Sequence, residues 1–192
     1  MRPKQFSFLP KLRLNHGGDI DKNKRKIARP FSHKHAIHVV FRSVKARGTW
    51  SLLTRANERL VKQLLNTCAG RYHIKVYRFE NVGNHLHLLI QTEARQYQTA
   101  KREFQGFLRQ FAGEIAFRIT GAKKSTPRGG FWEKRVYSRL VTWGREFRSL
   151  CDYFTKNFFE SKGLWAGAQD GWITPWLESM IEAGIAVGVG PP

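Results

Sequence analysis

The sequence predicts one α+β domain in which an antiparallel sheet packs against helices. Three observations predict this class. The 192 residues are enough for one core of ordinary size and too few for two. Short runs rich in β-branched and aromatic residues alternate with longer amphipathic segments. Two of the short runs are joined by a turn of only four residues, which is typical of a hairpin.

The first strand and the first helix are predicted between residues 36 and 67. The segment Ala36–Ser43, AIHVVFRS, has the composition of a strand. From Ser51 to Thr67, leucine and valine recur at helical spacing, and Gly70 is expected to end that helix. The next segment, His73–Glu80, alternates as a strand does. These elements give the order strand, helix, strand.

A hairpin and two further helices complete the predicted domain. The turn-forming residues 81–84 lead into a second hairpin strand, His85–Thr92. An amphipathic helix is predicted for Gln96–Ile119, a short strand for Val136–Thr142 and a last helix for Glu146–Ser161. The resulting order β-α-β-β-α-β-α predicts a ferredoxin-like split β-α-β antiparallel sheet with helices on one face and an added C-terminal helix. The other face would then be free for a ligand.

The charge of the chain indicates a polyanionic partner. Lysine and arginine number 34 against 14 acids, which gives a formal net charge of +20. Two cysteines do not make a disulfide framework, and neither a secretory signal nor a membrane span is apparent. We therefore expect a cytoplasmic protein that binds nucleic acid and no membrane.

The uneven charge divides the chain into three parts. Residues 1–30 read as a basic flexible arm without hydrophobic period, and residues 31–163 as the folded domain. Residues 164–192 contain glycine, three acids and no lysine or arginine, and read as a C-terminal tail. The sequence does not choose between a monomer and a homodimer.

His85 and His87 are the sharpest local signal. Residues i and i+2 of a strand point to the same face, so both imidazoles should project together while Leu86 enters the core. Two histidines placed in this way can share one metal ion. Taken alone, the pattern is more typical of two strand histidines that bond to neighbours or face solvent, so a metal site needs a further element.

The last predicted helix supplies Tyr153 and Asn157. Residues four apart lie on one side of a helix, so the Asn157 amide oxygen could bind a metal beside the Tyr153 hydroxyl. Both lie next to the apolar stripe of that helix rather than inside it. A boundary tyrosine that packs its ring and hydrates its hydroxyl remains the alternative.

Together these segments resemble a known family. NVGNHLHLLI, GGFWEKRVYSRLV and CDYFTKN resemble the REP-associated tyrosine transposases and the wider single-tyrosine HUH (IS200-like) transposases over residues 33–163. The resemblance implies that Tyr153 is the nucleophile and that His85, His87 and Asn157 hold Mg²⁺ or Mn²⁺. It also implies cutting and rejoining of single-stranded DNA near hairpins through a 5′-phosphotyrosine. Many relatives have proline after the asparagine, where this chain has Phe158.

Aromatic and basic residues predict a DNA-binding surface. Rings that stack on bases and guanidinium groups that contact phosphates are typical of single-stranded DNA sites. A packed Trp132 with surface arginines is an equally simple interpretation, and His38 reads as a core or sheet-surface histidine. We assign DNA binding to Trp132, Arg135, Arg139, Arg42 and Lys45.

Two other functions remain open from the sequence. RNA-binding modules of the same split β-α-β topology stack bases on an open sheet, and the positive charge would suit them too. A domesticated transposase would bind DNA without cutting it. Histidines at the exposed strand positions favour a metal site over a stacking platform.

Overall fold

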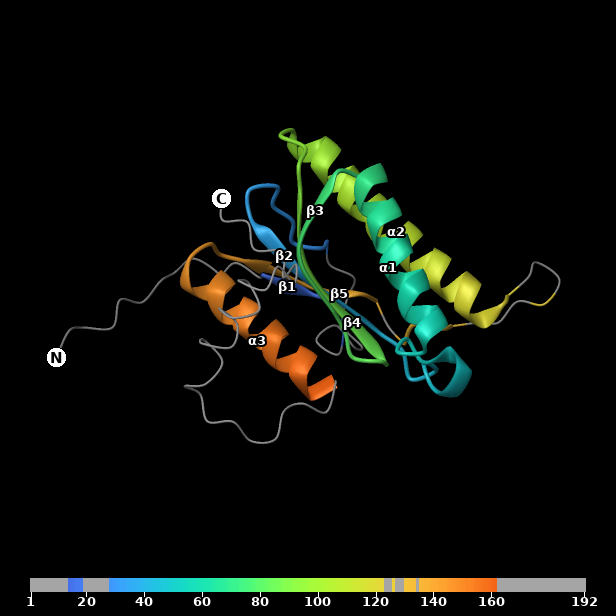
Figure 1. The fold of residues 1–192 in the computed structure, drawn as a ribbon. Coiled ribbons are helices and arrows are strands. Elements are labelled where there is room, and N and C mark those ends of the chain that lie inside the picture. The colour runs from blue at the N-terminus through green and yellow to red at the C-terminus, as the bar shows by residue number, and fades with distance from the viewer. Residues whose placement is uncertain (1–13, 19–27, 123–125, 127–129, 134, 162–192) are drawn as a thin grey trace.

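The computed structural model describes residues 14–18, 28–122, 126, 130–133 and 135–161. Within these ranges the chain folds into a sheet with three α-helices (Figure 1). The order of elements is β1 (Asn15–His16), β2 (Ala36–Arg42), the 3-10 turn η2 (Gly48–Trp50), α1 (Arg55–Arg71), β3 (Ile74–Asn81), β4 (His85–Thr92), α2 (Tyr97–Thr120), β5 (Tyr137–Val141) and α3 (Arg145–Ser161).

The five strands form one open sheet in the order β1-β5-β2-β4-β3, and every neighbouring pair is antiparallel. The predicted α+β class, hairpin and order of elements are confirmed. Strand β2 lies at the centre of the sheet, between β4 and β5. A register shift between Val76 and Arg78 places one extra residue in β3, which bends that edge strand.

The main core lies between the sheet and the helices α1 and α2. Alternate residues of β2, namely Ile37, Val39 and Phe41, are buried on this side. Helix α1 begins at Arg55 rather than Ser51 because η2 precedes it and the Thr54 hydroxyl accepts the Asn57 N–H as a cap. Helices α1 and α2 each have an apolar stripe at helical spacing, and both stripes are buried against these strands.

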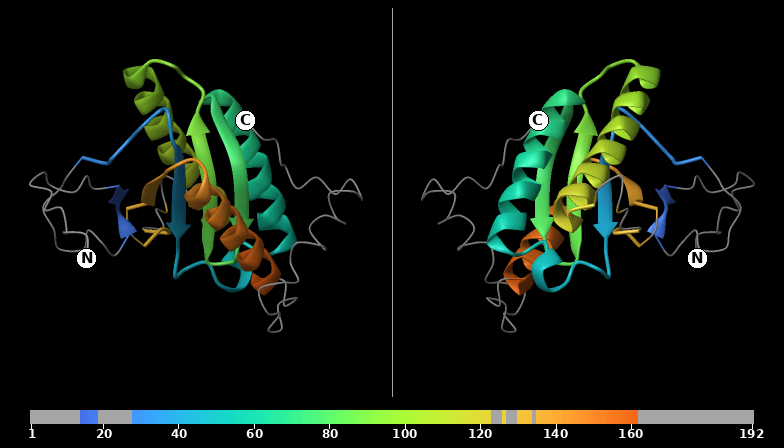
Figure 2. Two further views of the ribbon diagram at one scale, coloured as in Figure 1. Left: turned by 90° about the vertical axis from the view of Figure 1, so that its left-hand side faces the viewer. Right: turned by 90° about the vertical axis from the view of Figure 1, so that its right-hand side faces the viewer.

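The third helix lies on the opposite face of the sheet, which corrects the expectation that this face is free. In Figure 1 the sheet separates α3 from α1 and α2, and the two views of Figure 2 agree. Phe154 of α3 is buried in a second, small core with Ala36, Leu89 and Val141. The physical reason is that the apolar stripe of α3 must be buried. The other face of the sheet is already covered by α1 and α2, so α3 packs on this one.

The sheet also extends into the segment predicted to be a flexible arm. Asn15 and His16 pair with Arg139 and Ser138 as the edge strand β1. The Arg29 guanidinium donates hydrogen bonds to the Ser138 hydroxyl and the Val136 carbonyl. The predicted boundary at residue 30 is therefore wrong for these residues. Residues 1–13 and 19–27 of the arm and the tail 164–192 lie outside the described residues.

None of the helices in the described ranges is long and apolar enough to cross a membrane.

Candidate active site at the interface of strand β4 and helix α3

The histidine pair stands at the start of β4, directly after a tight turn. Gly83 has a positive φ of 93°, which favours glycine, and its N–H donates to the Asn81 side chain. The Asn81 amide in turn donates to the Leu52 carbonyl, which fixes the turn to the loop before α1. His85 and His87 therefore start from a well-held position. They share one face of the strand, as predicted, and α3 covers that face.

His87 is buried beneath α3. Its side chain is 4% exposed, and its Nδ1 lies 3.2 Å from Nε2 of His38, with the two rings stacked. Burial and the neighbouring imidazoles of His38 and His85 lower the pKa of His87 to about 3. The ring is therefore neutral at pH 7, and one of its nitrogens carries a free lone pair.

The tautomer adopted at the contact with His38 decides which nitrogen of His87 carries the lone pair. Two neutral imidazoles that share one hydrogen bond supply one N–H and one lone pair at the contact. When His87 Nδ1 donates to His38, the lone pair of His87 lies on Nε2. That Nε2 is buried and has no hydrogen-bond partner among the described residues. A buried nitrogen without a partner is costly, and a metal ion would satisfy it.

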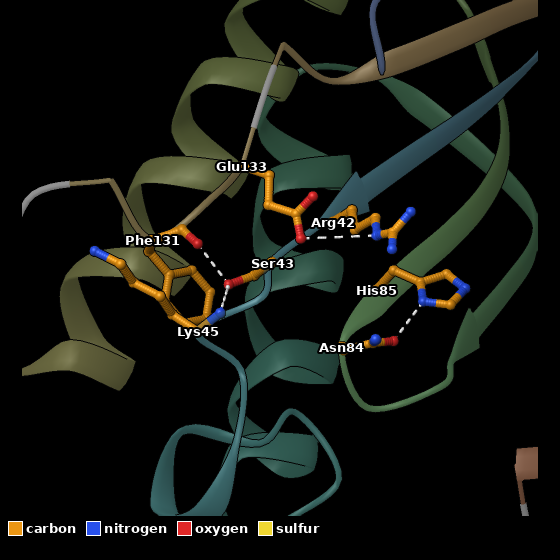
Figure 3. Close-up of polar contacts among 7 residues, drawn as sticks. All are labelled: Arg42, Ser43, Lys45, Asn84, His85, Phe131 and Glu133. Carbon is orange, nitrogen blue, oxygen red and sulfur yellow. Dashed lines mark hydrogen bonds and ion pairs between the residues drawn. The ribbon is translucent and has the colours of Figure 1, made fainter. Parts of the chain in front are cut away.

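His85 is held in the same manner. Its Nδ1 lies 2.6 Å from Oδ1 of Asn84, which accepts the ring N–H and leaves the lone pair on Nε2 (Figure 3). The ring is half-buried, and burial together with the charge of Arg42 lowers its pKa. Both histidines thus have Nδ1 at a supporting contact, and His87 keeps a lone pair on Nε2 in the tautomer in which its Nδ1 donates to His38.

Helix α3 brings Tyr153 to this pair. The Tyr153 ring lies edge to face with His87, with ring centroids 5.9 Å apart, although the two residues are far apart in the sequence. Tyr153 is 45% exposed, while its neighbour Phe154 is buried and anchors the helix. The predicted nucleophile therefore lies beside one predicted metal ligand, His87, whose ring contacts that of His85.

Asn157 differs from its predicted position at the edge of the apolar stripe. It is 9% exposed, so it is buried rather than at the solvent boundary. Its Nδ2 is buried and makes no hydrogen bond to the described residues. The unpartnered atom is an N–H donor, whereas a metal ion would bind the amide oxygen, so this burial does not by itself make Asn157 a metal ligand.

The donor set fits a metal ion only if Asn157 takes part. No group of three or more His, Cys, Asp and Glu side chains in the described ranges is placed to hold a metal. The donors that the sequence predicts are Nε2 of His85, Nε2 of His87 and the Asn157 amide oxygen. Imidazole favours Mn²⁺ over Mg²⁺ by ligand preference, and the amide oxygen suits both.

The residues assigned to DNA binding fall into two groups. Trp132 packs on Phe41 and Phe131 and donates its indole N–H to the Ala112 carbonyl at 2.9 Å. Arg139 lies 2.6 Å from Glu146 of α3. These two side chains therefore have structural partners. Arg42, Arg135 and Lys45 are exposed, and Arg42 lies 3.7 Å from Glu133 (Figure 3).

His38 also belongs to the site, although the sequence did not assign it there. It is 8% exposed, and burial and the Arg139 charge lower its pKa to about 4. The signal was present in the alternation of β2, where Ile37 and Val39 face the main core and His38 must face the other way. Strand order was needed to see that this is the face of His87.

The two buried imidazoles predict a loss of stability in mild acid. The folded pKa values of His38 and His87 lie below 6.5, so the unfolded chain binds more protons and stability falls as pH drops below about 6.5. By pH 5 the loss should be about 2 kcal/mol for each ring. Urea unfolding at pH 7, 6 and 5 measures it, and His38→Gln should reduce the dependence on pH. A free energy of unfolding that is constant over this range would contradict the burial of these rings.

Comparison with known proteins shows a shared fold at low sequence identity. No protein-family model and no curated protein sequence matches the chain. The solved structure of a REP-associated tyrosine transposase bound to a REP hairpin matches with a TM-score of 0.53 and 12% identity, over 87% of this chain and 88% of its own. A candidate transposase from Deinococcus radiodurans has a TM-score of 0.40 and 17% identity, over 69% of this chain and 97% of its own. The fold that the resemblance implies is confirmed by the first of these.

Proposed function

We propose that the chain is a metal-dependent single-stranded DNA endonuclease and strand transferase, a transposase that works through Tyr153. The observation that carries this proposal is the contact of the half-exposed Tyr153 ring with buried His87, at 5.9 Å between centroids. If Tyr153 served only to pack its ring, there would be no reason for two neutral histidines with free Nε2 atoms to lie beside it. The fold shared with a tyrosine transposase supports the same assignment.

The reaction needs a nucleophile, charge stabilisation and a leaving group. The Tyr153 oxygen attacks the phosphorus and loses its proton to solvent, while the bond from phosphorus to the 3′ oxygen breaks. The released 3′ oxygen takes up a proton, and Tyr153 keeps the 5′ phosphate. The reverse attack by a 3′-hydroxyl rejoins the strands, so the energy of the phosphodiester bond is conserved and no ATP is consumed.

The described residues support this chemistry in distinct ways. His85 and His87 are neutral at pH 7, so they can donate lone pairs without first losing a proton. A divalent metal bound there would supply Lewis-acid stabilisation of the phosphate oxygens. Phe154, buried beside Tyr153, anchors the helix so that the Tyr153 ring stays beside His87.

DNA is the proposed substrate because of charge and fold. A net charge of +20 suits a polyanion, and the structural neighbour was solved with a REP hairpin. A splayed single strand reaches a recessed tyrosine more readily than a stacked duplex does. The RNA-module alternative is less favoured, because α3 covers part of the sheet face on which such modules stack bases.

A denaturing gel tests the proposal. The protein is incubated with Mn²⁺ and a hairpin-flanked single strand labelled at its 5′ or 3′ end. We expect the label to migrate with the protein only when it lies 3′ of the cut, because Tyr153 retains the 5′ phosphate. Cut DNA without adduct would indicate hydrolysis, and uncut DNA would indicate a binding protein. Either result contradicts the proposal.

Binding should depend steeply on salt. Each phosphate neutralised on a single strand contributes about −0.7 to the slope of log K against log salt. Deleting residues 1–13 removes four basic residues and spares β1, so it should flatten the slope without loss of folding. Fluorescence anisotropy from 50 to 200 mM salt measures both slopes. An affinity that is insensitive to salt would contradict the proposed electrostatic contact.

A further inference from the structure

A pocket of about 230 Å³ lies where the end of β2 meets the segment before β5. Val40 and Arg42 of β2, Trp132, Glu133 and Tyr137 line it. Pockets for drug-sized ligands usually measure about 300 to 1,000 Å³, so this one suits a smaller group.

The pocket is next to the histidine pair. Val40 lies opposite His87 on one side and opposite Tyr137 on the other. Residues directly opposite in antiparallel strands project to the same face, and strands are about 4.8 Å apart. The Tyr137 wall is therefore about 10 Å from His87 across the sheet. Helix α3 contacts the sheet chiefly over β3, so the pocket lies on the opposite flank of the histidines.

The walls combine rings, cations and one carboxylate oxygen that pairs with Arg42 but accepts no hydrogen bond from the described residues. The Glu133 side chain is 17% exposed, and its Oε1 makes no hydrogen bond to the described residues, although Arg42 Nε lies 3.7 Å from it. A buried acceptor without a donor costs free energy. Arg42 and Arg135 supply positive charge beside it, and the Tyr137 ring supplies a π surface.

We propose that this pocket receives one unpaired nucleobase of the DNA strand, and that Glu133 selects a base with an exocyclic amino group. The inference rests on the proposed function, because it takes single-stranded DNA as the ligand. A carboxylate accepts well from an amino group such as N4 of cytosine. Thymine has no amino group, and its one N–H lies between two carbonyl oxygens that the carboxylate repels. Snug pockets that stack an unpaired base and read its edge are known in enzymes that act on DNA.

Strands made of a single base test this selection whatever the alignment of the DNA on the protein. A 15-nucleotide strand of cytosine or of thymine presents the same base to the pocket in every alignment, and both strands have equal charge. The full chain with Tyr153→Phe serves as the starting protein, so that binding is measured without cleavage. By fluorescence anisotropy, we expect the cytosine strand to bind about tenfold more tightly, since one good contact to a base edge discriminates by this order.

A matched pair of variants assigns the selection to Glu133. Glu133→Gln should bring the ratio of the two affinities close to one, because the amide both donates and accepts. Glu114→Gln on α2 removes the same charge from a carboxylate that also pairs with an arginine, Arg118, and should keep the ratio. Equal affinities in the starting protein, or a ratio that Glu133→Gln does not change, would overturn the proposal. Adduct formation by the unmodified protein is measured separately, so this failure is distinct from failure of the proposed function.

Discussion

Replacing Tyr153 with phenylalanine is expected to abolish the covalent protein–DNA adduct and strand cleavage, while single-stranded DNA binds about as tightly as before. The substitution keeps the ring, which contacts His87 and Phe154, and removes only the hydroxyl that would bond to phosphorus. Because the side chain is 45% exposed, the free energy of unfolding should change little. Denaturing gels with end-labelled strands and urea unfolding measure these effects.

Tyr97→Phe is the matched control for this variant. Tyr97 is exposed to a similar extent, 43%, but it lies at the start of α2 against Phe31. It should form the adduct at the rate of the unmodified protein. If Tyr153→Phe still forms an adduct, the nucleophile is another tyrosine, with Tyr137 the first to examine, and the proposed site is wrong.

His85→Ala is expected to reduce single-turnover cleavage by about a thousandfold or more, because loss of a metal ligand removes Lewis-acid stabilisation worth several kcal/mol. Binding of Mn²⁺, followed by electron paramagnetic resonance, should weaken in parallel, and EDTA should stop cleavage by the unmodified protein. His85 is half-buried and its ring bonds only to the adjacent Asn84 among the described residues, so the fold should survive its removal.

His73→Asn provides the control for His85→Ala. His73 has an exposed side chain that pairs with Glu103 near the far end of the hairpin, and asparagine tolerates its positive φ of 48°. It should retain both metal binding and cleavage. Undiminished cutting by His85→Ala, or by the unmodified protein in metal-free buffer, would show that the histidines do not hold a catalytic metal.

His87 is a poorer probe of the chemistry than the sequence indicated. From the strand pattern, both histidines point out of the sheet, and removal of either should open no cavity. The structure contradicts this for His87, which is 4% exposed and packs against His38 and Phe154. His87→Ala should therefore lose stability as well as activity, because it leaves a void and an unpaired His38 nitrogen.

The sequence alone determined the features that depend on local period and on composition. Alternation in β2 and β4 determines which residues share a face, and this is why His85 and His87 were correctly paired. The spacing of apolar residues located α2 within one residue at each end and α3 within one residue at its start, because burial of one face requires a helical stripe. The net charge of +20 likewise indicates a polyanionic partner from composition alone.

The tertiary structure decided which of these faces meet. The burial of His87 under α3, its bond to His38 and the packing of Trp132 onto Ala112 join residues that are far apart in the chain. Local period is identical whether a strand face is covered or open, so the sequence could not show that α3 covers the face of the histidines. Strand order places Val40 between His87 and Tyr137, and thereby sets the pocket beside the site. The physical reason is that these contacts come from the burial of apolar surface shared between distant elements, which no single segment specifies.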